Sequence, residues 1–113
     1  MVKETLEAVD KAVGLADRRP KDHCAAVESL GGGWVGEEAL GIALYSVLSA
    51  GSFTEVIAIA ANHSGDSDST ASIAGQLWGT SHGLAEMPHA WVTSLDVYLP
   101  LLHLARQMSI LTA

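Results

Sequence analysis

The sequence predicts an all-α fold. Apolar residues recur every three or four positions in several long segments, which is the spacing of one helix face. Residues that begin or end helices stand between these segments. One apolar segment, "FTEVIAIAANH", has enough β-branched residues to resemble a strand, but its alanines and the capping signal before it favour a helix.

The first predicted helix begins near Val2 and ends at Arg18-Arg19-Pro20, because proline disfavours the helical conformation of the residue before it. A short helix is predicted over residues 22–29, and the glycines at 31–33 then interrupt the chain. The apolar stripe of the first helix consists of Val2, Leu6, Val9, Val13 and Ala16.

Two helices are predicted in the middle of the chain. The first covers residues 35–48, has two glutamates in its first turn, where they complement the helix dipole, and stops at Gly51. The second covers residues 53–63 and opens with "SFTE". This is a capping box, in which Ser52 and Glu55 each accept a hydrogen bond from the other's backbone N–H.

Three further helices are predicted in the second half. Residues 69–83 form a long one, in which two glycines four positions apart would admit another helix at close range. A short helix starts at Pro88 and runs through Trp91, since proline suits a first helical turn. The last helix covers residues 94–108, with a kink expected at Pro100.

Length and composition predict one folded domain and exclude some partners. The chain has 113 residues, of which 49% are hydrophobic and 17% charged. A net charge of −7 argues against nucleic acid or an anionic membrane surface as partner and suits cations. So apolar a chain with few aromatic residues is expected to leave an apolar face for a partner or for self-association.

The apolar runs, the cysteine content and the N-terminal residues of the sequence indicate the compartment. No run of about 18 apolar residues is present, so no membrane-spanning helix is expected. Cys24 is the single cysteine and is expected to be a buried, inert thiol. With no signal-like N-terminus, we expect a cytoplasmic protein.

The polar stretch "NHSGDSDST", residues 62–70, allows several interpretations. Asp68 or Ser69 could simply cap the following helix. An EF-hand loop starting at Asp66 would need glycine and glutamate where Ala71 and Leu77 stand, so that interpretation fails. The pattern also matches the D-x-D-x-T of aspartate-nucleophile phosphatases, which require a lysine and further acids downstream.

A hard-cation site is the remaining interpretation. The carboxylates of Asp66 and Asp68 and the hydroxyl of Ser69 would supply three oxygen ligands of the kind that Mg²⁺ prefers. A loop can direct neighbouring ligands to one point, whereas a helix would send positions i and i+2 to different sides. A cation would also offset the repulsion between the two carboxylates. His63 is a candidate hydrogen-bond partner that would orient the aspartates without binding the metal itself.

Three stretches together resemble the ADP-ribosylglycohydrolase family, which includes dinitrogenase-reductase-activating glycohydrolase. They are "GGGWVGEEALGIALYSVL", "SFTEVIAIAANHSGDSDSTASIAGQLWG" and "MPHAWV", in this order and spacing. Residues 31–113 match the C-terminal part of such a domain, with a metal loop at 65–70, and residues 1–30 are lead-in helices. The resemblance implies an orthogonal helical bundle, here a partial domain, that removes ADP-ribose from modified side chains or small molecules.

The resemblance also implies a site with two Mg²⁺ ions, or Mn²⁺ in some members, that bind the ribose hydroxyls and a water. Carried over by position, Asp66, Asp68 and Ser69 are metal ligands. Gly32 and Gly33 would lie near the ligand, and Trp34 could stack on it. The family's remaining acidic ligands and the acid that activates water have no counterpart in this sequence.

The sequence therefore supports two hypotheses. In the first, this polypeptide is one part of a metal-dependent glycohydrolase and needs a complementing N-terminal half. In the second, it is a non-catalytic helical interaction module or remnant whose aspartates only cap a helix. Which ADP-ribosyl acceptor would be cleaved does not follow from these residues.

Overall fold

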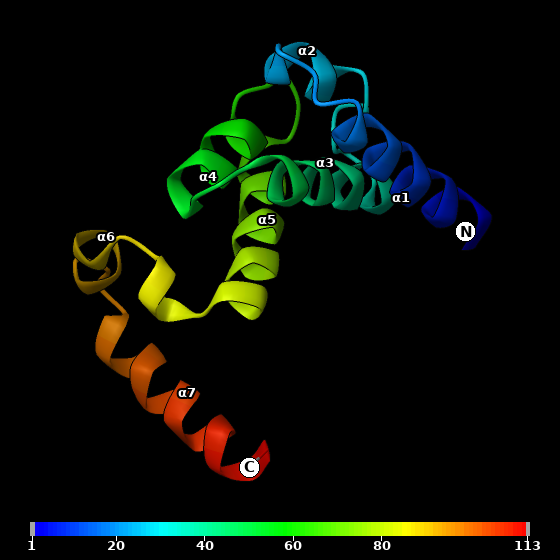
Figure 1. The fold of residues 1–113 in the computed structure, drawn as a ribbon. Coiled ribbons are helices and arrows are strands. Elements are labelled where there is room, and N and C mark those ends of the chain that lie inside the picture. The colour runs from blue at the N-terminus through cyan, green and yellow to red at the C-terminus, as the bar shows by residue number, and fades with distance from the viewer. Residues whose placement is uncertain (1, 113) are drawn as a thin grey trace.

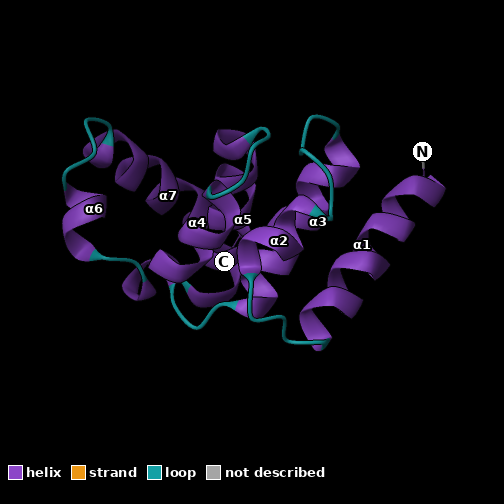
Figure 2. Cartoon of the chain, turned by 90° about the horizontal axis from the view of Figure 1, so that it is seen from above, coloured by secondary structure: helices purple, strands orange, loops and turns teal. Residues whose placement is uncertain are grey.

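The computed structural model describes residues 2–112, and every regular element within that range is a helix (Figures 1 and 2). The predicted all-α fold class is therefore confirmed. The elements, in chain order, are α1 (Val2–Asp17), α2 (His23–Glu28), α3 (Gly36–Ser49), α4 (Phe53–Ala61), α5 (Ser67–His82), the 3₁₀ turn η1 (Leu84–Glu86), α6 (His89–Thr93) and α7 (Tyr98–Thr112).

Helix α3 is the central element of the packed part of the molecule. It contacts α1, α4 and α5, and α4 also packs along α5. In Figure 1, α3 runs across α5, so these two packed helices cross rather than lie parallel, as in an orthogonal bundle. The aspartate stretch joins α4 to α5 and is therefore held between two helices that pack on each other.

The core consists of two neighbouring clusters that share α3. In the first, Tyr45 and Ile42 are fully buried against α1 and α2. In the second, Val56 of α4 and Trp78 of α5 pack on the other side of α3. Burying one such large apolar side chain stabilises the fold by about 1.5–3 kcal/mol, so these clusters fix the positions of α4 and α5.

Small residues let α1 approach α3 closely. A methyl group added at Gly41 of α3 would lie 3.5 Å from the carbonyl oxygen of Ala8. Ala12 of α1 is fully buried on the same side. The apolar stripe predicted for this helix instead lies largely in solvent, since Val2 and Leu6 are exposed. The helix prediction is correct, but alanines provide the packing face.

Several helix ends differ from the prediction. Ser52 caps α4 by accepting the Glu55 N–H, but the Glu55 carboxylate accepts the N–H of Gly51 rather than that of Ser52. Only one half of the predicted capping box forms. The helix also ends at Ala61, two residues earlier than predicted.

The last helix begins at Tyr98, four residues later than predicted, and continues to Thr112. Pro100 therefore lies in the first turn of α7, where a backbone N–H would have no partner within the helix. This position accommodates proline without the predicted kink. The short helix after Pro88 is present as α6, with Pro88 at its N-cap position.

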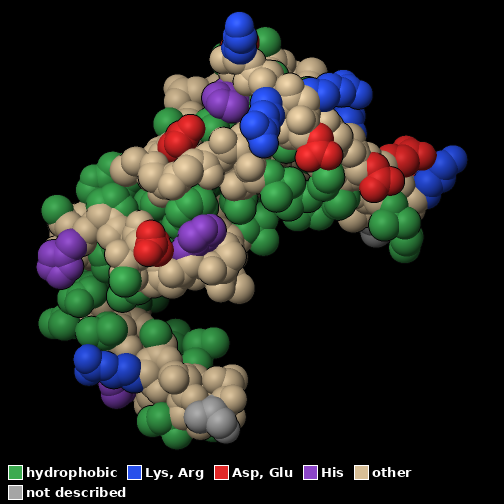
Figure 3. Space-filling view, in the orientation of Figure 1, with side chains coloured by type: hydrophobic (Ala, Val, Ile, Leu, Met, Phe, Trp, Pro, Cys, Tyr) green, Lys and Arg blue, Asp and Glu red, His purple; other side chains and the backbone are tan. Residues whose placement is uncertain are grey.

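Helix α7 projects away from the α1–α5 body, and its hydrophobic side chains are spread over the lower limb of the molecule (Figures 1 and 3). Leu99, Leu101, Leu104 and Met108 are about half exposed or more. Cys24 is exposed as well, against the prediction that it would be buried, because the first turn of α2 lies at the surface. No helix among residues 2–112 has the length and apolar character needed to cross a membrane.

Candidate functional site

The aspartates lie where α5 begins. Asp66 occupies the N-cap position, and its carbonyl oxygen accepts the N–H of Thr70 at 3.1 Å. The helix therefore starts at Ser67, two residues before the predicted start, and neither Asp68 nor Ser69 is its cap. The Asp66 side chain makes no capping hydrogen bond either. The expectation that Asp68 or Ser69 is the N-cap is therefore wrong, although the Asp68 carboxylate accepts the N–H of Ser69 within the first turn.

The two carboxyl groups lie side by side. The pKa of Asp68 is lowered, mainly by a side-chain hydrogen bond with Asp66 and further by the N–H of Ser69, which lies 3.0 Å from Oδ1 of Asp68. Asp68 is in the first helical turn, but Asp66 precedes the helix with a backbone ψ of 69°. That turn in the backbone offsets the divergence expected for positions i and i+2, so the two side chains converge.

The aspartate loop, residues 62–66, rests directly on the glycine segment 31–33. The backbone N–H of Asp66 donates to the carbonyl oxygen of Gly32 at 2.7 Å. A Cβ atom at Gly65 would lie only 1.9 Å from that oxygen, which is too close for any other residue. The two segments, more than thirty positions apart in sequence, can meet only because position 65 has no side chain.

Gly33 contributes to the same contact. Its backbone has a φ of +76°, a conformation that favours glycine, and a Cβ there would lie 2.7 Å from the Thr70 methyl group. Gly32 and Gly33 thus lie against the aspartate loop and the start of α5. Trp34 follows and is 72% exposed.

His63 and Thr70 hold the aspartate loop through side-chain hydrogen bonds. The N–H of Gly65 donates to Nδ1 of His63 at 3.1 Å, so in a neutral ring the proton is on Nε2. Nε2 lies 2.8 Å from the hydroxyl of Thr70, which in turn donates to the carbonyl oxygen of Ala60 at 2.7 Å. The Thr70 hydroxyl also lies within hydrogen-bond distance of the carbonyl oxygens of Asp66 and Ser67. His63 therefore contacts the loop backbone and Thr70 rather than the carboxylates themselves.

A third anchor comes from α2, which sequence reasoning did not connect to the site. Glu28, the last residue of α2, accepts the backbone N–H of Ser64 at 2.7 Å and its hydroxyl at 3.0 Å. These two bonds lower the pKa of Glu28, so its carboxylate stays ionised at neutral pH. An acid at the end of a short helix carries no local signal for a contact 36 residues away, and only the fold reveals it.

The family follows from a comparison over the whole chain. A family model described as ADP-ribosylglycohydrolase matches residues 1–113, the thirty lead-in residues included. The chain belongs to the ADP-ribosylglycohydrolase family. The paired aspartates at the start of α5 are thus those of a glycohydrolase-family chain, and the resemblance of the three quoted stretches is confirmed.

One curated relative is similar over part of this chain. It is described as ADP-ribosylarginine hydrolase Tri1 from Pseudomonas putida (strain GB-1). The two sequences are 42% identical over 55 residues, which cover 49% of this chain and 15% of the relative. The matched region is therefore a small part of that protein. No solved structure matches this chain.

The donor set suits a hard divalent cation but is incomplete. Two adjacent carboxylates and the neighbouring Ser69 hydroxyl are the oxygen ligands that Mg²⁺ or Mn²⁺ takes. Among residues 2–112, however, no group of three or more His, Cys, Asp or Glu side chains could hold a metal ion. The described residues therefore do not complete a cation site by themselves.

Proposed function

We propose that this chain is the C-terminal part of a metal-dependent ADP-ribosylglycohydrolase and provides one side of its two-metal site. Asp66, Asp68 and Ser69 would hold Mg²⁺, or Mn²⁺ in its place. The observation that carries the proposal is the side-by-side placement of the Asp66 and Asp68 carboxyls at the start of α5 in a chain of this family. The Asp66 side chain makes no capping hydrogen bond, and the Asp68 carboxylate accepts the N–H of Ser69 in the first helical turn.

Each part of the site would have a distinct task. The bound metal would polarise the ribose and orient a water for attack on the anomeric carbon. The chain's own residues would hold the metal and place the ligand: the Gly32–Gly33 backbone lies against the aspartate loop, and the exposed Trp34 ring offers a stacking surface. The acid that activates the water is not among our candidates and would belong to the complementing part of the domain.

The substrate would be an ADP-ribosylated protein or a small ADP-ribose derivative. Arginine is the acceptor that the name of the relative suggests, and the segment shared with that protein supports testing arginine conjugates first. A complementing N-terminal half is supported by the incomplete donor set and by the exposed apolar side chains of α7.

The metal role is tested by replacing one ligand. In Asp68→Asn, we expect Mn²⁺ affinity to fall by more than about tenfold, since even loss of a residue behind a metal ligand typically costs 10- to 100-fold. The measurement is a Mn²⁺ titration followed by electron paramagnetic resonance. Asp96→Asn, in the exposed turn before α7, is the matched control. Equal affinity of the two variants would contradict the assignment.

The activity is tested with and without its missing part. ADP-ribose release from ADP-ribosylarginine is measured for the chain alone and with a supplied N-terminal half of a family member. We expect release only in the second condition. No release in either would favour the non-catalytic interaction module.

A further inference from the structure

Glu28 holds the aspartate loop without belonging to it. Both of its carboxylate oxygens are used: Oε1 accepts the Ser64 N–H at 2.7 Å and Oε2 accepts the Ser64 hydroxyl at 3.0 Å. Ser64 stands two residues before Asp66. A carboxylate that accepts two hydrogen bonds from one residue fixes both the position and the orientation of its backbone.

We propose that Glu28 is a positioning residue of the metal site, holding the aspartate loop so that the Asp66 and Asp68 carboxyls meet. The inference rests on the proposed function for its consequence in metal binding, while its effect on the loop can be measured without any metal.

The end of α2 and the glycine segment act on the loop at two points. Glu28 holds Ser64, and four residues later the Gly32 carbonyl oxygen accepts the Asp66 N–H. The connection between them is itself tied to α1, because Lys11 Nζ donates to the Ser29 carbonyl oxygen at 2.7 Å. The loop is therefore fastened on both sides of Gly65, the residue with the least steric restriction on its backbone.

The placement of Glu28 argues against a purely structural role. Its side chain is exposed and buries no apolar surface, and the groups that it binds are exposed as well. Removing it should leave the two core clusters intact. It should free Ser64 and Gly65 to sample other backbone conformations, which would move Asp66 relative to Asp68.

The experiment compares Glu28→Ala with Glu7→Ala, a control on α1 whose side chain makes only an exposed ion pair with Lys3. Amide hydrogen exchange, followed by NMR without metal, should become at least about tenfold faster at Ser64 and Asp66 in Glu28→Ala but not in the control, since local opening then suffices for exchange. Exchange in α3 and the melting temperature should match the control.

Two further variants should accelerate amide exchange at Ser64 and Asp66 less than Glu28→Ala does. Glu28→Gln keeps one acceptor oxygen and should be intermediate, and Ser64→Ala, which keeps the backbone N–H bond, should be close to wild type. Mn²⁺ affinity should fall in the same order as exchange rises.

Three outcomes decide the matter. Unchanged exchange at Asp66 in Glu28→Ala overturns the proposal, whatever the metal does. Faster exchange spread through α3 overturns it too, since Glu28 would then stabilise the whole fold. If wild type binds Mn²⁺ and Glu28→Ala binds it equally well, the loop effect has no bearing on the site. Absence of Mn²⁺ binding by wild type would count against the proposed function alone, because the exchange result still decides the role of Glu28 in the loop.

Discussion

At the scale of single residues, Gly65 and Gly14 differ in what the fold requires of them. At Gly65 an added Cβ would lie 1.9 Å from the Gly32 carbonyl oxygen, a backbone atom that cannot rotate away. At Gly14, in the middle of α1, no atom lies within 4 Å of an added Cβ. Position 65 therefore requires glycine for the approach of two backbone segments, whereas position 14 does not.

This contrast gives a paired prediction. Gly65→Ala should destabilise the protein by about 1–3 kcal/mol, because the two segments must separate and the Asp66–Gly32 hydrogen bond is lost. Gly14→Ala should stabilise it by up to about 1 kcal/mol, since alanine is the better helix former. Urea unfolding of both variants provides the measurement, and a neutral Gly65→Ala would show that the loop can shift without cost.

Among the candidate site residues, residue types alone led to Asp66, Asp68 and Ser69 as the proposed hard-cation donors. They were expected to share one loop, but only Asp66 precedes the helix, whereas Asp68 and Ser69 lie in the first turn of α5. Glu28 and Thr70 were missed for a related reason. Their contacts with the loop depend on how α2 and α4 lie against it, and neither residue has a distinctive neighbour in sequence.

At the scale of elements, the α1–α3 contact shows how small residues are used. The added Cβ at Gly41 would stand 3.5 Å from the Ala8 carbonyl oxygen and 3.9 Å from its Cβ, which are ordinary contact distances. There is room for one methyl group at this crossing and for little more. Helix α1 packs through its alanines and leaves Val2 and Leu6 in solvent.

Gly41→Ala should therefore be tolerated, and should stabilise the protein by up to about 1 kcal/mol through reduced backbone entropy of the unfolded chain. Gly41→Leu should cost about 1–3 kcal/mol, because the larger side chain forces α1 away from α3. Thermal unfolding of the two variants tests this, with circular dichroism to verify unchanged helix content. Equal destabilisation of both variants would show that α1 and α3 pack more closely at Gly41 than the distances indicate.

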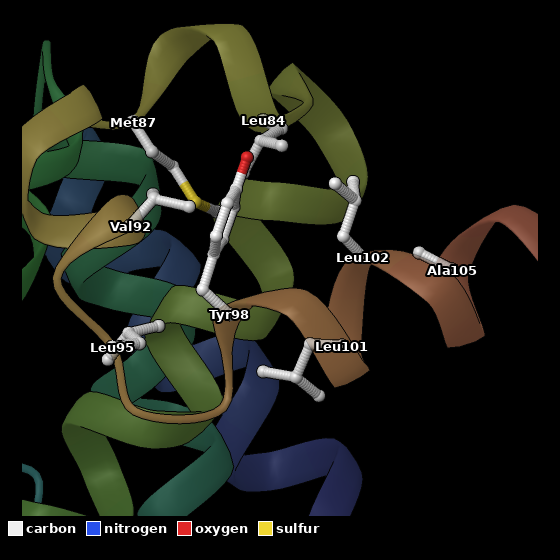
Figure 4. Close-up of a pocket in the computed structure, with 8 residues that line it drawn as sticks. All are labelled: Leu84, Met87, Val92, Leu95, Tyr98, Leu101, Leu102 and Ala105. Carbon is white, nitrogen blue, oxygen red and sulfur yellow. The ribbon is translucent and has the colours of Figure 1, made fainter.

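At the scale of the whole molecule, burial is unevenly distributed. The α1–α5 body contains the fully buried side chains, whereas all of α7 is half-buried or exposed among the described residues. A pocket of about 230 Å³ lies at the base of α7, and the Tyr98 ring points within it toward Leu84 and Met87 (Figure 4). Its lining is apolar and distant in sequence from the aspartates.

Stability should follow this distribution. Ile42→Ala, in the centre of the first cluster, should cost about 2–5 kcal/mol, whereas Leu104→Ala on α7 should cost less than about 0.5 kcal/mol. The free energy of unfolding from urea titration distinguishes them. Comparable losses would mean that α7 is packed in solution, against the body or against another copy, and would contradict the open arrangement of Figure 1.

The sequence by itself determined the helical fold class, the order of the helices, the candidate ligands and the family. These rest on local spacing, on residues that begin and end helices, and on oxygen donors that stand within four positions of one another. Only the tertiary structure decided which face of α1 packs, where α5 starts, and that Glu28 and Gly32 fasten the aspartate loop. Such contacts join residues more than thirty positions apart, so they depend on the packing of whole helices around α3, which no local pattern encodes.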